Sequence, residues 1–218
     1  MEASVASGGS AGSLPLVERL VAADGSATHD WPARLVDGST ERRDLADAIH
    51  ALCMLHGHHP GMADDALTRG VQAEAAAWLG LVGEAFAAER AALATLVAAA
   101  GPLPSTPGHA ESEAAILTQR HALDMLARSD RRGCASGAVA ALVLDWPAVR
   151  RVLDHAASMF GAAIPPSSLP DPAHTSAALA MLGATPACER AIGFGAQQLL
   201  AQHRGLWSLL EARAEARA

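Results

Sequence analysis

The sequence predicts an all-α protein, a bundle of six or seven mostly antiparallel helices without a sheet. Alanine, leucine, glutamate and arginine dominate the 218 residues, whereas β-branched residues are few. Apolar side chains recur at helical spacing, and proline and glycine gather between the apolar segments rather than inside them. Hydrophobic residues make up 50% of the chain, which is enough to bury a core without a metal or a disulfide.

The N-terminal half predicts a tail followed by two helices. Residues 1–13 are rich in serine and glycine and show no apolar periodicity, so we expect a disordered tail. A first helix is predicted over 40–56, with Thr40 as its N-cap and an apolar stripe of leucine and isoleucine. A second helix is predicted over 64–100, which Gly70 could divide into a short and a long piece.

The middle of the chain predicts two further helices. The third covers about 109–128, and the fourth covers about 134–145. Because the fourth is apolar all round apart from its end, we expect it at the centre of the fold. Pro147 then begins a further helix, or kinks the same one, which continues to about residue 160. Residues 164–172 are predicted to form an extended linker.

Two helices complete the chain. A short one is predicted over 174–182 and a long one over 186–215. The long helix begins with Thr185 as N-cap and Pro186 at the first helical position. We therefore expect a single helical-bundle domain over 14–218.

Helical spacing also predicts which polar residues point inward. His203 lies between two leucines of the apolar stripe of the last helix, and Glu89 lies on the edge of the stripe within 64–100. A buried imidazole or carboxylate needs a partner, which is either a structural hydrogen bond or ion pair, or a bound ligand. Both interpretations stay open, and we expect His203 to meet at least one of Glu89, His121 and Asp124 inside the bundle.

Two short motifs bear on metal binding. His121 and Asp124 are three residues apart on one helix, and Asp47 and His50 repeat that spacing in reverse order on another. Di-iron bundles carry Glu-x-x-His on two helices, so the match to a ferritin-like site is partial, and spacings of this kind also arise by chance. The candidate ligands for iron, another divalent metal or a small molecule are His50, Glu89, His121, Asp124 and His203.

Arginines flank the break before the apolar helix. Arg128, Arg131 and Arg132 lie close to the predicted helix start, and Gly133 would allow a close approach to the backbone. These residues are candidates for binding an anion. The alternative is an ordinary turn in which the arginines are solvated or pair with neighbouring acids.

A histidine cluster lies in the turn after the first predicted helix. His56, His58 and His59 are separated only by Gly57. A zinc site would need a further ligand from a second element, which His109 could supply. The alternative is a polar, solvated turn.

Composition excludes several classes of function. All 16 basic residues are arginine, and lysine, tyrosine and asparagine are absent. A Schiff-base lysine and a phosphate-loop lysine are therefore excluded. The net charge of −7 and the scarcity of aromatic residues argue against a nucleic-acid partner.

Other features bear on location. We see no apolar run long enough to span a membrane, and the start of the chain lacks the pattern of a signal peptide. We therefore expect a cytoplasmic protein in which Cys53, Cys134 and Cys188 are reduced thiols.

One segment of about a quarter of the chain resembles a known family. It is carried by PLPSTPGHAESEAA (102–115), QRHALDMLARSDRRGCA (119–135) and ALVLDW (141–146). These residues resemble an uncharacterised family of helical proteins from GC-rich alphaproteobacteria of the sphingomonad kind. The resemblance implies a helical fold and no particular activity.

Two classes of function remain. The first expectation is a non-enzymatic binding or scaffold module that docks a protein partner or a second copy through a helix face. The alternative is a ferritin-like bundle that binds a metal or a small molecule and is a metal-dependent oxidoreductase. Alanine-rich surfaces and few aromatic residues favour the first class slightly.

Overall fold

The structure, a computed structural model, describes residues 13–182 and 185–217. Helices occupy 79% of this part of the chain, and no strand occurs in it, as the sequence predicts. The elements in chain order are α1 (Ser13–Asp24), η1 (Ser26–Thr28), α2 (Asp30–Asp37), α3 (Arg42–His56), α4 (Met62–Arg69), η2 (Ala73–Ala75), α5 (Ala76–Ala100), α6 (His109–Ala127), α7 (Cys134–Phe160), α8 (Pro172–Met181) and α9 (Pro186–Glu215).

The described residues form nine α-helices, so the prediction of six or seven is wrong. Part of the difference is α1 and α2, which precede the first predicted helix. The eight-residue α2 is too short for a clear apolar stripe, and its N-cap is His29, whose side chain accepts a hydrogen bond from the backbone of Trp31. α1 already begins at Ser13, inside the predicted tail, and the rest of that tail, 1–12, lies outside the described residues.

Glycine and proline act differently on two of the predicted helices. Gly70 ends α4 because its backbone is left-handed, with φ of 68°, a conformation that favours glycine. The predicted helix over 64–100 is therefore two α-helices, α4 and α5, with the short turn η2 between them. Pro147, in contrast, lies inside α7, which runs as one helix from Cys134 to Phe160.

The predicted caps are confirmed at one helix and corrected at another. Thr185 accepts a hydrogen bond of 3.2 Å from the backbone N–H of Cys188, and Pro186 is the first residue of α9. Thr40 does not cap α3. The N-cap is Glu41, whose backbone N–H donates to Asp44 at 3.1 Å.

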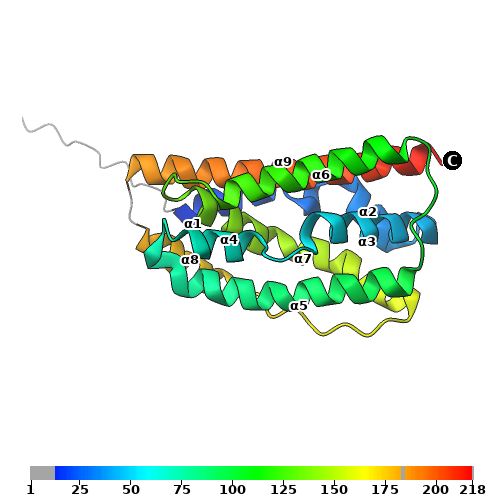
Figure 1. The fold of residues 1–218 in the computed structure, drawn as a ribbon, viewed down its shortest axis with the longest axis horizontal. Helices are drawn as coiled ribbons and strands as arrows, with labels where there is room; N and C mark the ends of the chain where they lie inside the picture. Colours follow the sequence, from blue (N-terminus) through cyan, green and yellow to red (C-terminus); the bar gives the residue numbers. More distant parts are fainter. Residues whose placement is uncertain (1–12, 183–184, 218) are drawn as a thin grey trace, which may run out of the picture.

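α7 is the central helix, as its apolar sequence predicts. Its first thirteen residues, from Cys134 to Trp146, are all buried except Leu144. Figure 1 shows α6 and α9 along one long side of the molecule and α5 along the other, with α7 running between them. Polar side chains on the buried part of α7 are therefore enclosed by several helices.

Small residues let α7 and α9 pack closely. A Cβ added at Gly137 would lie 2.2 Å from the carbonyl oxygen of Ile192, and one added at Gly195 would lie 2.0 Å from that of Cys134. No side chain fits in either space, so the two backbones are in direct contact. The small residues at the start of α7 therefore serve helix packing.

In the described part of the chain, no helix is both long and apolar enough to cross a membrane.

Candidate functional site

Three buried side chains from three helices form a continuous hydrogen-bonded chain, here called the Asp–His–His chain. Asp145 of α7 lies 2.7 Å from Nδ1 of His203 on α9. Nε2 of His203 lies 3.0 Å from Nε2 of His56, at the end of α3. Their exposed fractions are 1%, 2% and 7% in that order, so water does not compete for these bonds.

Asp145 is held from its other side by Ser26 of η1. The backbone N–H of Ser26 donates to one carboxylate oxygen at 2.7 Å, and its hydroxyl donates to the other at 2.5 Å. The indole N–H of Trp207 donates in turn to the Ser26 hydroxyl at 2.9 Å. Burial alone would raise the pKa of Asp145, but the hydrogen bonds from His203 and Ser26 outweigh it and lower that pKa. Asp145 is therefore an ionised carboxylate inside the bundle.

The ionised Asp145 and a neutral His203 together define where the protons lie. Because Asp145 is ionised, Nδ1 of His203 must carry a proton and donate it. A neutral His203 then has a bare Nε2, which accepts the proton on Nε2 of His56. In this arrangement Nδ1 of His56 is bare, and it has no hydrogen-bond partner among the described residues. The chain therefore ends in an unprotonated nitrogen that can accept a hydrogen bond.

Burial and two neighbouring imidazoles keep His56 neutral. Burial lowers the pKa of His56 well below its ordinary value, and the neighbouring His203 and His58 lower it further. The ring of Trp146 meets the His56 ring edge-on at a centroid distance of 5.3 Å, and Phe86 packs beside both. His56 is thus a neutral imidazole in an aromatic environment.

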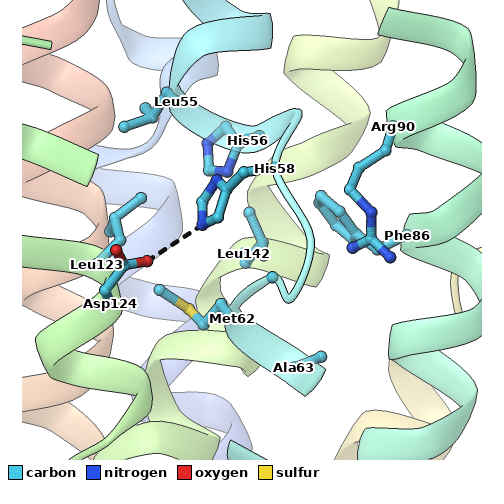
Figure 2. Close-up of a pocket in the computed structure, with 11 residues that line it drawn as sticks. Leu55, His56, His58, Met62, Ala63, Phe86, Arg90, Leu123, Asp124 and Leu142 are labelled. Carbon is cyan, nitrogen blue, oxygen red and sulfur yellow. Dashed lines mark hydrogen bonds and ion pairs between the residues drawn. The ribbon is translucent and has the colours of Figure 1, made fainter. Parts of the chain in front are cut away.

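His56 lines a small cavity, here called the histidine cavity, together with His58, Arg90 and Asp124. Leucine, methionine and phenylalanine side chains complete its wall. Its volume of about 20 Å³ holds about one water molecule. Figure 2 shows His58 reaching from the loop after α3 toward Asp124, with Phe86 and Arg90 on the other side of the view.

His58 contributes a second imidazole to this cavity. Its Nε2 lies 3.1 Å from Asp124 of α6, while its Nδ1 is buried and has no partner in the described structure. A buried polar atom without a partner is rare and indicates a water or ligand atom nearby. Two imidazoles with unpartnered Nδ1 atoms therefore line one water-sized cavity.

The loop that carries His58 is fixed by Asp64 at the start of α4. Its carboxylate accepts from the backbone N–H of Gly61 at 2.8 Å and from Arg90 of α5 at 3.2 Å. A Cβ at Gly83 of α5 would come within 2.8 Å of that carboxylate, so the absence of a side chain there makes room for it. The position of His58 is thus set by α4, α5 and α6 together.

The predicted ligand residues lie in five different places. His203 is in the Asp–His–His chain and Asp124 is at the histidine cavity, whereas Glu89 pairs with Arg150 at 3.0 Å. His121 is exposed, and the ring of His50 lies 2.9 Å from the carbonyl oxygen of Gly101. The side-chain partners of His203 in the described structure are Asp145 and His56, so the expected contact with Glu89, His121 or Asp124 is absent. Helical spacing predicts a face but not the neighbouring helix that it meets.

The Asp47–His50 motif does not converge on a metal. Asp47 is buried in an ion cluster, where it accepts from Arg213 at 2.8 Å and from Arg217 at 2.7 Å. Within residues 13–182 and 185–217, no three histidine, cysteine or acidic side chains are placed to hold a metal ion. All three cysteines are free.

The three candidate anion-binding arginines diverge. Arg128 pairs with Asp65 at 2.9 Å and Arg132 pairs with Glu74 at 2.9 Å, while Arg131 stacks over the ring of Phe194. Each therefore has a partner within the protein, as in the interpretation of this segment as an ordinary turn.

Sequence reasoning did not identify Asp145 or Ser26, and it considered His56 and His58 only as candidate zinc ligands or as part of a polar turn. A signal for Asp145 was present, because it is the only charged residue between Cys134 and Trp146. No comparable signal identifies Ser26, which is brought to Asp145 by tertiary packing.

Comparison with known proteins adds one finding. Residues 21–218 match the model of a family described as "Family of unknown function (DUF6975)". No curated protein and no solved structure matches the chain.

Proposed function

Because the chain belongs to DUF6975, a family of unknown function, we propose its function from the geometry of the histidine cavity alone. The protein is a proton-transfer enzyme in which the cavity holds the reacting water, His56 is the general base, and the substrate is a small molecule that meets this water at the edge of the cavity. The observation that carries this proposal is the buried Asp–His–His chain, which ends in the unpartnered Nδ1 of His56.

The proton follows the existing hydrogen bonds. A water molecule in the cavity gives a proton to Nδ1 of His56 as its oxygen attacks an electrophilic substrate. Nε2 of His56 passes its own proton to Nε2 of His203, 3.0 Å away. The positive charge then rests on His203 beside the carboxylate of Asp145, and the proton returns to the leaving group by the reverse path.

This path assigns the two histidines different tasks, because one accepts the proton from water and the other carries the positive charge. His56 cannot hold a positive charge, because burial and its neighbours lower its pKa. His203 can hold it, since Asp145 is ionised and lies 2.7 Å away. A base that remains neutral at pH 7 and transfers its charge to a buried ion pair suits general-base catalysis.

Of the two classes that the sequence leaves open, this geometry favours the small-molecule class. A scaffold that docks a partner through a helix face has no need of a charged network in its core. The proposal includes no metal, because the residues predicted as ligands do not gather at one place.

Hydrolysis of p-nitrophenyl acetate, a small activated ester, tests the proposal. We expect the wild-type protein to accelerate hydrolysis and His56→Gln to lower the rate at least about tenfold, because general-base catalysis contributes that much or more. The rate should fall only well below pH 6.5, where His56 becomes protonated.

The matched control is His121→Gln, which removes an exposed imidazole and should leave the rate unchanged. Asp145→Asn should also slow hydrolysis, because the amide does not stabilise a cationic His203. A His56→Gln protein that is as fast as the wild type would contradict the proposal.

A further inference from the structure

A second hollow, unrelated to the histidine cavity in its chemistry, lies between α7 and the segment that leads to α8. We call it the α7 groove. Its volume is about 390 Å³, which is in the range of small-molecule sites. Its apolar wall is formed by Val143, Leu144, Trp146, Pro147, Leu169 and Pro170.

Arg150 holds the two sides of the α7 groove together. Its guanidinium donates to both carboxylate oxygens of Glu89, to Asp154 at 2.7 Å and to the carbonyl oxygen of Pro165. The bond to Pro165 ties the linker to α7, and the bonds to Glu89 tie α7 to α5. These bonds hold the wall of the α7 groove in place. Because Arg150 is engaged in all of them, its guanidinium is not free to bind a ligand.

One charged side chain of the α7 groove, Arg151, has no partner among the described residues. Of the two acids that line it, Asp154 is paired with Arg150, and Asp171 accepts from the backbone and ring of His174 at the start of α8. Arg151 also lines the groove, is exposed, and has no hydrogen-bond or ion-pair partner among the described residues. An anionic group of a ligand would therefore find one guanidinium that no carboxylate of the described residues contacts.

A second observation also points to a ligand. Trp146 is fully buried and lines the α7 groove, and its indole N–H has no partner in the described structure. Buried donors are nearly always satisfied, so this N–H indicates an acceptor atom of a water or a ligand beside Trp146.

We propose that the α7 groove binds a small amphipathic carboxylate, with the apolar body against Leu144, Pro147 and Leu169 and the carboxylate on Arg151. The apolar wall accounts for the body of the ligand, and the uncommitted guanidinium accounts for its charge. This site is separate from the proposed hydrolytic function, because none of these contacts involves His56 or His58.

Calorimetric titration with octanoate, octanol and octylammonium tests the proposal. We expect octanoate to bind saturably and about tenfold or more tightly than octanol, because a charge-assisted hydrogen bond to arginine is lost in the alcohol. Octylammonium should bind most weakly of the three. Equal affinities for octanoate and octanol, or no saturable binding of octanoate, would overturn the proposal.

Two variants and one control test whether the ligand binds in the α7 groove. Arg151→Gln should reduce the affinity for octanoate to that for octanol, while Arg19→Gln, which removes an exposed arginine from α1, should change neither. Because Arg151 also borders a hollow beside α2, Leu169→Trp fills only the α7 groove and should abolish binding of both ligands. Unchanged octanoate binding in either groove variant, with native circular dichroism, would show that the groove is not the site.

Discussion

The Nε2 atoms of His56 and His203 lie 3.0 Å apart in the core of the bundle, although 147 residues separate them in the sequence. Only one proton fits between two nitrogens at this distance. The pair therefore takes up one proton where two histidines of an unfolded chain would take up two. This difference in proton uptake makes the stability of the folded protein depend on pH.

The first prediction is that His56 makes folding sensitive to mild acid. Its pKa is lowered in the folded protein by burial and by His203, so below about pH 6.5 the unfolded chain binds a proton that folded His56 does not. Stability should fall as the pH is lowered from 7 to 5, by up to about 2 kcal/mol from this residue. Urea denaturation at several pH values measures this loss. Between pH 7 and 5, the free energy of unfolding of His56→Gln should fall less than that of the wild type by that amount. Equal losses in the two proteins would contradict the prediction.

The second prediction concerns Asp145→Asn. The carboxylate accepts three hydrogen bonds, so its replacement should cost about 1.5–3 kcal/mol at pH 7. Burial would raise its pKa, but hydrogen bonds from His203 and Ser26 lower it, so its contribution is present above about pH 4 and is lost as the pH falls further. Denaturation midpoints of the two proteins should therefore converge in acid. A gap that stays constant down to pH 3 would show that the charge of Asp145 is not involved.

The third prediction concerns the pair of Glu89 and Arg150. Both oxygens of Glu89 accept from one guanidinium nitrogen in the core, so Glu89→Gln leaves a buried cation short of its counter-ion. We expect the free energy of unfolding, measured by urea denaturation, to fall by about 3–5 kcal/mol. The loss is smaller to the extent that Asp154, the other ion-pair partner of Arg150, compensates. The control Glu113→Gln, at an exposed position on α6, should change stability by less than about 0.5 kcal/mol. Similar losses in the two variants would mean that the buried pair has no special role.

The fourth prediction compares two glycines within helices. Gly195→Ala places a methyl group against the backbone of Cys134 and should lower stability by about 2 kcal/mol or more, because α7 and α9 must separate. Gly80→Ala in α5 meets no atom within 4 Å and should raise stability by up to about 1 kcal/mol through helix propensity. If Gly195→Ala also stabilised the protein, the close approach of α7 and α9 would be wrong.

The sequence predicts this fold better than it predicts the candidate site. Apolar periodicity identifies the longer helices and the buried position of His203, because both depend on local spacing. The hydrogen-bond partners of His203 come from distant parts of the chain, and no local pattern pairs α9 with the end of α3. His56 illustrates the difficulty, since the glycine after it indicates a solvated turn, whereas α5, α7 and α9 enclose its ring.

Nitrogen NMR of the imidazole rings tests the central claim most directly, because it reports which ring nitrogens of His56 and His203 carry protons. At pH 7 we predict a neutral His56 with a proton on Nε2 and a bare Nδ1, and a His203 with a proton on Nδ1 facing Asp145. A proton on Nδ1 of His56 at pH 7, or a bare Nδ1 on His203, would contradict the account.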